Sequence, residues 1–130
     1  MVKVRLLGAM LAGMVLMPGM ALAQSIEELT RQGTEAYNTG DCAGSEQIWR
    51  RVLRESFDNA LAHHWLGYTL ACQNKLDAAI ASYDRAIELN PNDAIAYNNR
   101  GLALSDQGEL EAAIASYDRA IELNPNYAIA

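Results

Sequence analysis

The segment AAIASYDRAIELNPN occurs twice in this chain, at Ala78–Asn92 and again at Ala112–Asn126, with a fixed offset of 34. Identity of this length at a fixed offset indicates an internal repeat. Apolar residues recur in the segment with the spacing of one helical face. Pro91 ends the pattern, because proline lacks a backbone donor and disfavours helical geometry in the residue before it. The period therefore predicts a stack of helical units.

Steps of this period divide the chain into three units, 26–59, 60–93 and 94–127. The second and third units are identical at 21 of 34 positions, and the first keeps the register without an insertion. Each unit is expected to contain two helices, predicted at 26–38, 43–56, 60–73, 76–89, 94–107 and 110–123. Residues 128–130 repeat the start of a unit and are interpreted as a truncated fourth repeat. The alternative is that the last helix meets another chain.

Local chemistry supports these boundaries. The turn of each unit contains a residue that tolerates positive φ, at Gly40, Asn74 and Gly108. At the first helix, Ser25 and Glu28 have the spacing of a capping box.

Three further glycines, Gly33, Gly67 and Gly101, fall in the middle of predicted helices and are again separated by one period. A glycine inside a helix costs about 1 kcal/mol relative to alanine. Its recurrence predicts that the partner helix approaches closely at these positions.

The N-terminal stretch 1–23 has the pattern of a secretory signal peptide. Lys3 and Arg5 precede an apolar run at 6–17, and Pro18-Gly19 is expected to break the helix before a small-residue cleavage site that ends at Ala23. A membrane anchor is the alternative, but the run is shorter than the roughly 20 residues that span a bilayer. We therefore expect cleavage, export to a periplasm and no stable membrane insertion afterwards.

Composition limits the partners of the exported part. Removal of Lys3 and Arg5 leaves 10 − 2 = 8 basic residues against 16 acidic ones, a net charge of −8. Such a surface repels phosphate backbones, so nucleic acid is not an expected partner. The remaining residues suffice for one small domain.

The repeated residues resemble those of the tetratricopeptide repeat family, in its exported bacterial type. The second unit carries the pattern as Leu66, Gly67, Leu70, Ala79, Tyr83, Ala86 and Pro91, and the third as Tyr97, Gly101, Leu104, Ala113, Tyr117, Ala120 and Pro125. The first carries it as Leu29, Gly33, Ala36, Ser45, Trp49 and Val52. The resemblance implies an all-α fold, a right-handed α-solenoid of three helix-turn-helix repeats. Two departures are Arg100 for leucine and Phe57 for proline, and Phe57 predicts a less sharp end of its helix.

The resemblance also implies a function: non-catalytic binding of a peptide or protein segment in a concave groove lined by the first helix of each unit. The groove positions carried over are Thr30, Arg31, Thr34, Asn38, His64, Trp65, Tyr68, Ile95, Asn98, Asn99 and Leu102. An alternative for Trp65 and Tyr68 is packing between units. The positions at which one subgroup binds a chaperone carboxylate contain no lysine or arginine here, so that role is not expected. A structural spacer or assembly platform is the competing function, with self-association through the last helix.

Cys42 and Cys72 are the only cysteines, and a stacked array places them at the same edge of neighbouring units. In an oxidising compartment we expect a disulfide between them, with two separate buried thiols as the alternative. A remote alternative is a metal or redox protein that uses His64 and Cys72, which lie on one predicted helical face. Zinc needs three or four ligands and no nearby run supplies the rest, so neither a metal nor a cofactor is expected.

Catalytic residues are not expected either. The acidic residues recur at equivalent positions, such as Asp84 and Asp118, as they do on a solvated face. An acid/base pair instead requires two carboxylates in contrasting environments. The sequence therefore does not indicate an enzyme.

Overall fold

The structure, a computed structural model, describes residues 18–129, with side chains described from 26 to 127. The helices are α2 (Pro18–Asn38), α3 (Cys42–Glu55), α4 (Ala60–Cys72), α5 (Leu76–Leu89), α6 (Ala94–Asp106) and α7 (Leu110–Leu123), followed by the 3₁₀ helix η1 (Pro125–Ile129). Within this range there is no β-strand, and none of these helices is long and apolar enough to cross a membrane.

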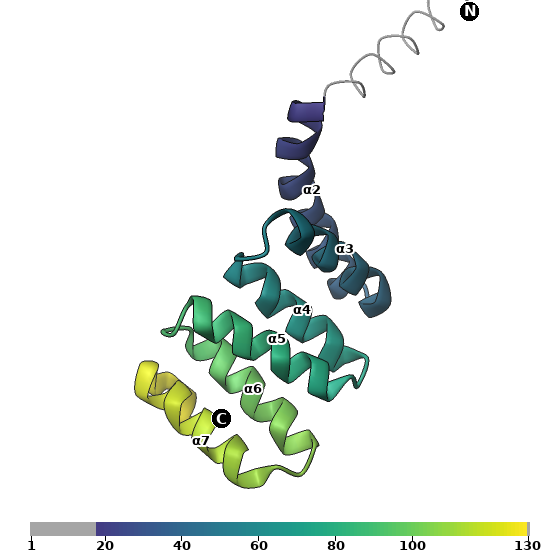
Figure 1. Ribbon diagram of the computed structural model, residues 1–130. Helices are drawn as coiled ribbons and strands as arrows, with labels where there is room; N and C mark the ends of the chain where they lie inside the picture. Colours follow the sequence, from purple (N-terminus) through teal and green to yellow (C-terminus); the bar gives the residue numbers. More distant parts are fainter. Residues whose placement is uncertain (1–17, 130) are drawn as a thin grey trace, which may run out of the picture.

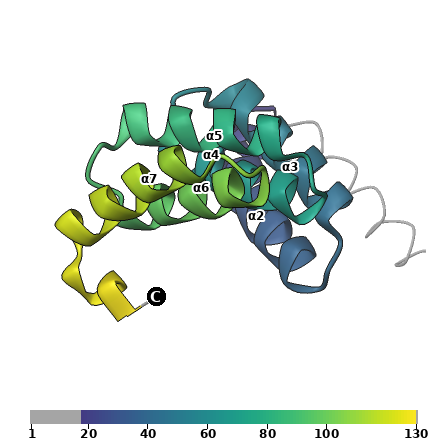
Figure 2. The same ribbon diagram turned by 90° about the horizontal axis from the view of Figure 1, so that it is seen from below.

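The helices form a helical solenoid, stacked in chain order from α2 at one end to α7 at the other (Figure 1). Each unit is a pair, α2 with α3, α4 with α5 and α6 with α7, and consecutive pairs meet through α3 with α4 and α5 with α6. The first helices also contact one another, α2 with α4 and α4 with α6. Seen from below, η1 lies at the end of the stack beyond α7 (Figure 2). The predicted all-α fold is confirmed.

Turns and caps set the helix ends. The three predicted turn residues have positive φ, 89° at Gly40, 60° at Asn74 and 84° at Gly108, so that prediction is confirmed. Side chains of Asp41, Asn59 and Asp93 accept hydrogen bonds from the first turns of α3, α4 and α6. These bonds satisfy backbone donors that have no partner inside the helix.

The glycines within the first helices permit close packing, as predicted. A Cβ atom at Gly67 would lie 2.5 Å from the ring of Tyr83, which is fully buried. The equivalent contacts join Gly33 to Trp49 at 2.8 Å and Gly101 to Tyr117 at 2.7 Å. Each unit thus packs an aromatic ring of its second helix onto the glycine of its first.

The beginning of α2 differs from the prediction. The helix begins at Pro18, where it was expected at residue 26, and its N-terminal turns project beyond the other helices (Figure 1). Ser25 is therefore inside the helix and is not its cap, and the Glu28 carboxylate accepts hydrogen bonds from Arg31 and Gln32. Pro18 is the first described residue of α2, a position that proline fits because its missing N–H has no intrahelical partner there. The predicted break at Pro18-Gly19 concerns the chain before it, outside the described residues, and stays a prediction.

The other helix bounds agree with the prediction to within one residue. The effect predicted for Phe57 was wrong: α3 ends at Glu55, which is equivalent to the last residues of α5 and α7. Ser56 leaves helical geometry with φ −141° and ψ 72°, as Asn90 does after α5 with φ −140° and ψ 86°, so α3 ends without a proline.

Two predictions concern the chain ends. Most of the predicted signal peptide, residues 1–17, lies outside the described residues, and its predicted cleavage site after Ala23 lies in α2. Residues 125–129 form η1, and the interpretation of 128–130 as a fourth unit stays a prediction.

Candidate functional site

An apolar hollow of about 370 Å³ lies along α4, next to the end of α2 and the start of α6. Its lining residues are Tyr37, Leu61, His64, Trp65, Tyr68 and Ile95. Leu61 is 57% exposed and Ile95 46%, so two large apolar side chains border the hollow in contact with solvent. Four of the predicted groove residues, His64, Trp65, Tyr68 and Ile95, are brought together here.

Aromatic rings form the wall of this hollow. The ring of Tyr37 lies 5.6 Å from that of Trp65, edge to face, and 5.5 Å from that of Tyr68, measured between centroids. Trp65 also stacks on the buried Trp49 of α3, with centroids 5.8 Å apart and planes 8° from parallel. Trp65 is thus both a packing residue between two units and a wall of the hollow.

A second hollow of about 300 Å³ adjoins the first and shares Tyr37 and Tyr68 with it. Asn99, Leu102 and Asp106 of α6 line it together with Cys72 of α4. We call the two hollows together the groove, defined by their lining residues.

The floor of the groove contains a polar bridge between α4 and α6. The buried His64 accepts a hydrogen bond at Nε2 from Asn99 Nδ2 (3.3 Å), and its Nδ1 lies 3.1 Å from Asp93 Oδ2. Because Asn99 Nδ2 can only donate, the imidazole carries its proton on Nδ1, and this N–H donates a hydrogen bond to Asp93. The other oxygen of Asp93, Oδ1, accepts hydrogen bonds from the backbone at the start of α6. The Asp93 carboxylate therefore contacts both His64 and the start of that helix.

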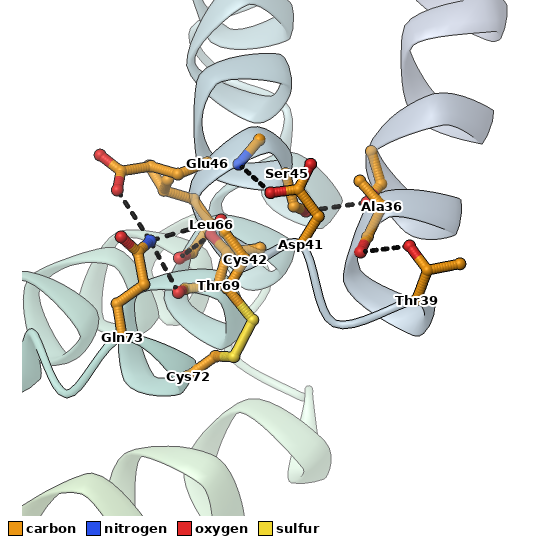
Figure 3. The surroundings of a disulfide bond; sticks show 12 residues. Ala36, Thr39, Asp41, Cys42, Ser45, Glu46, Leu66, Thr69, Cys72 and Gln73 are labelled. Carbon is orange, nitrogen blue, oxygen red and sulfur yellow. Dashed lines mark hydrogen bonds between the residues drawn. A yellow bond between two sulfur atoms is a disulfide. The ribbon is translucent and has the colours of Figure 1, made fainter.

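Cys42 and Cys72 are joined by a disulfide, with their Cα atoms 6.2 Å apart (Figure 3). The bond connects the first residue of α3 with the last residue of α4, and so the first unit with the second. Beside it, Gln73 Nε2 donates to the Cys42 carbonyl (3.3 Å) and to Glu46 Oε1 (2.9 Å) (Figure 3). Because Cys72 also lines the second hollow, the disulfide is part of the groove wall.

Glu46 makes two ion pairs at this junction. Its carboxylate lies 2.7 Å from Arg50 Nε and 3.0 Å from Lys75 Nζ. Hydrogen bonds from Arg50, then Lys75, lower the pKa of Glu46 from 4.5 to about 2, partly opposed by burial. Its contacts with Lys75 and Gln73 tie α3 to the turn after α4.

Five predicted groove residues line neither hollow: Thr30, Arg31, Thr34, Asn38 and Asn98. The hydroxyls of Thr30 and Thr34 donate to carbonyls of their own helix. Arg31 is exposed and paired with Glu28 and Glu35, so its charge is neutralised locally.

The prediction missed Tyr37, which lines both hollows. A signal existed in the repeat, because the equivalent positions in the other units hold the small residues Ala71 and Ser105. A large aromatic residue at a position that is otherwise small adds contact area that only the first unit provides.

The contacts of His64 and Cys72 give the metal hypothesis no support. Both nitrogens of His64 have protein partners, and Cys72 is in the disulfide. Among the residues that the structure describes, no group of three histidine, cysteine, aspartate or glutamate side chains could hold a metal ion.

Comparisons with known proteins give the family. A tetratricopeptide repeat model matches residues 30–92 and again 66–128. No curated protein matches the chain significantly in sequence.

Solved structures of tetratricopeptide repeat proteins are similar to this chain. An O-GlcNAc transferase of Thermobaculum terrenum is 34% identical with a TM-score of 0.76, over 81% of this chain and 20% of the transferase chain. MamA is 28% identical with a TM-score of 0.75, over 77% of this chain and 58% of its own. The TPR2B domain of yeast Sti1, solved as a complex with pHsp70, is 22% identical with a TM-score of 0.76, over 79% of this chain and 82% of its own.

This chain therefore spans only a fifth of the transferase and somewhat more than half of MamA, and the likeness to Sti1 is one of fold. The repeat model covers nearly all of the described helices, and the three structural neighbours agree with it. The chain belongs to the tetratricopeptide repeat family.

Proposed function

We propose that this protein binds a segment of a partner protein in the groove, without catalysis, and that an apolar side chain of the partner enters the aromatic hollow. The observation that carries the proposal is the exposure of Leu61 and Ile95 at the rim of a hollow walled by Tyr37, Trp65 and Tyr68. Tetratricopeptide repeats are generally non-catalytic interaction modules, which supports the same function.

The size of the hollow suits one anchoring side chain. Ligand sites in proteins typically enclose about 300–1,000 Å³, and this hollow is at the lower end of that range. Full burial of a leucine or phenylalanine side chain contributes about 1.5–3 kcal/mol. One anchor therefore gives modest affinity, and neighbouring contacts at Leu102 and Asn99 are needed for more.

The chemistry of the hollow argues for an apolar group over a carboxylate. Its described lining includes neither lysine nor arginine. A terminal carboxylate would lose water there without gaining a cationic partner. A chaperone segment that binds through its terminal carboxylate is consequently not proposed as a ligand here.

Selection from a random peptide display library tests the proposal. We expect the wild-type domain to enrich peptides with a large apolar or aromatic residue. The variants Leu61→Gln and Ile95→Gln should weaken the selected peptides about tenfold, since each removes part of an anchor contact worth about 1.4 kcal/mol. Trp65 is less suitable for substitution, because it also stacks on Trp49.

Leu110→Gln is the matched control, because Leu110 is 60% exposed but belongs to α7 and lies outside the groove. Peptides that bind all three variants as well as wild type would show that the groove is not the binding site.

A second candidate, an assembly platform, is supported by the exposed face of α7. Leu110 and Ile114 are 60% and 58% exposed, whereas their equivalents Leu76 and Ile80 pack against the core. Helix α5, which differs from α7 only by Asp77 in place of Glu111, packs against α6, so α7 offers a face for a helix of a similar kind. Sedimentation of wild type and Leu110→Gln tests this: a monomeric wild type at micromolar concentration would eliminate self-association.

Export to an oxidising compartment is part of the proposal. The Cys42–Cys72 disulfide supports it, because disulfides are rare in reducing compartments. Expression of the full chain in a bacterium, followed by mass measurement of the periplasmic protein, should show loss of residues 1–23. An intact N-terminus in the cytoplasmic fraction would contradict export.

A further inference from the structure

The two halves of the disulfide differ in accessibility. Cys42 is buried, at 6% exposure, while Cys72 is exposed at the end of α4 and lines the second hollow. Thiol–disulfide exchange requires a thiolate to reach one of the two sulfur atoms, and of the two residues it is Cys72 that is exposed. A reagent that enters the groove therefore meets Cys72 first.

The departing sulfur also has a defined environment. Cys42 is the first residue of α3, and a helix N-terminus stabilises negative charge. The neighbouring Asp41, whose carboxylate caps the helix, reduces that advantage without removing the orientation of the backbone N–H groups. Release of Cys42 as a thiolate is thus compatible with its position at the start of α3, whereas the burial of Cys42 hinders attack on its sulfur.

The bond also lies close in the chain to a groove residue. Tyr37 precedes Cys42 across the turn that joins α2 to α3. The disulfide joins Cys42, just after this turn, to the end of α4, and the ring of Tyr37, just before the turn, contacts Trp65 and Tyr68 of the same helix. Beside the bond, the same edge has the polar contacts of Glu46 with Gln73 and Lys75.

We propose that the Cys42–Cys72 disulfide is an exchange-active site for thiols, with Cys72 as the attacked residue, and that its reduction loosens the aromatic wall of the groove. The ligand class is a low-molecular-weight thiol. The importance of the loosened wall for partner binding rests on the function proposed above, but the exchange site itself does not.

The exchange proceeds in two balanced steps. A thiolate attacks Cys72 Sγ and forms a mixed disulfide there, while Cys42 Sγ leaves with the electron pair of the broken bond and takes a proton from water. A second thiolate attacks the ligand sulfur of the mixed disulfide, which releases Cys72 as a thiolate that is then protonated. Two small thiols are thereby oxidised to their disulfide, and the protein disulfide has gained two electrons and two protons.

Brief exposure of the full-length or exported protein to glutathione tests the site of attack. The reaction is stopped with acid, and the adduct is located by mass spectrometry without reduction. We expect glutathione on Cys72, with Cys42 as the free thiol, in at least about tenfold excess over the reverse arrangement, since exchange follows access to the sulfur. An equal distribution, or an adduct mainly on Cys42, would overturn the proposal.

Single-cysteine variants provide a second test of the same asymmetry. The variant Cys42→Ala retains only the Cys72 thiol, and the variant Cys72→Ala retains only the Cys42 thiol. The Cys72 thiol should react with Ellman's reagent at least about tenfold faster than the Cys42 thiol. In denaturant the two rates should become similar. If either variant does not fold, the glutathione adduct of the wild-type protein remains decisive.

Hydrogen exchange measures the effect on the groove, and no partner is required. After reduction, amides of residues 34–42 should exchange about tenfold faster, because the turn beside Tyr37 opens more often. The matching turn of the third unit, residues 102–110, has no disulfide and serves as the internal control, with unchanged exchange. Unchanged exchange at 34–42 would overturn the proposed loosening.

The two proposals can fail independently. An adduct on Cys72 with faster exchange at 34–42 supports the thiol site even if no peptide binds the groove. Peptide binding that depends on Leu61 and Ile95, in a protein whose disulfide resists glutathione, would support the groove and refute the exchange site.

Discussion

The two interfaces between units use the same register but different chemistry. At the first interface, the disulfide joins Cys42 and Cys72. One period later these positions hold Leu76 and Asp106, which have no covalent link. Both interfaces have polar bonds, from Gln73 to Glu46 at the first and from Gln107 to Asp77 at the second, so the covalent link is what distinguishes the first.

The same contrast extends to the groove. Tyr37, Trp49, Trp65 and Tyr68 form ring contacts at the first interface. Their equivalents at the second are Ala71, Tyr83, Asn99 and Leu102. Since both interfaces hold the same helix arrangement, the fold does not require the aromatic cluster or the disulfide. Their concentration at one interface indicates that the first and second units form the specialised part of the solenoid.

Removal of the disulfide should have the largest effect on this contrast. We expect the double variant Cys42→Ala/Cys72→Ala to lose on the order of 3 kcal/mol of unfolding free energy, because the closed loop spans 30 residues. Urea unfolding of wild type and variant, each with and without reductant, measures the loss. Reductant should destabilise only the wild type. If the double variant loses less than about 1 kcal/mol, the bond is not a major constraint.

Replacement of Trp65 by Asn, the residue at the equivalent position 99, should convert the first interface toward the second. We expect a loss of about 2–3 kcal/mol, because the stack on Trp49 and the edge contact with Tyr37 both disappear. Tyr68→Leu, which installs the residue equivalent to Leu102, should cost only about 1 kcal/mol, since it keeps an apolar side chain at the position. If Trp65→Asn and Tyr68→Leu lose the same unfolding free energy in urea, Trp65 is not the main contributor to the aromatic cluster.

The reverse experiment transfers the disulfide to the second interface. The variant Leu76→Cys/Asp106→Cys places cysteines one period after the native pair. We expect a second disulfide and a gain of about 1–2 kcal/mol, less than the native bond because the apolar contacts of Leu76 are lost. Titration of free thiols in denaturant should find none. Two free thiols would show that the two interfaces are not superimposable at this edge.

Acid should weaken the first interface slightly through Glu46. Its pKa is lowered in the folded protein to about 2 from 4.5, so its contribution is complete above pH 4.5 and disappears as the pH falls toward 2. For a partly exposed pair this contribution is about 1 kcal/mol. Glu46→Gln should flatten the dependence of unfolding free energy on pH within this window. An unchanged slope would mean that the contacts of Glu46 with Arg50 and Lys75 do not stabilise the fold.

Most of the architecture could be predicted because it depends on local chemistry repeated three times. Positive φ at Asn74 and ring packing on Gly67 follow from the residue type and the period. The start of α2 could not be predicted, because the residues from Ala21 to Gln24 are compatible with a helix as well as with a cleavage site. The effect expected of Phe57 failed because Ser56 adopts the same non-helical backbone geometry after α3 that Asn90 adopts after α5, without a proline.

The groove was harder to predict than the fold. Family positions indicate which helix face a residue occupies, but they do not give the depth of its side chain. Thr30 and Asn38 consequently line neither hollow, and His64 is buried in a bridge to Asn99. The contribution of Tyr37 depends on its contact with a different unit, which no pattern within its own unit contains.

The central claim is that the groove between the first helices binds a partner segment through its aromatic wall. The most direct test is an NMR titration of the domain with a selected peptide. We predict shifts of the ring protons of Tyr37, Trp65 and Tyr68 and of the Ile95 methyl groups, with the methyl groups of Leu110 and Ile114 on α7 unchanged. Shifts confined to α7, with the aromatic signals unchanged, would contradict the claim.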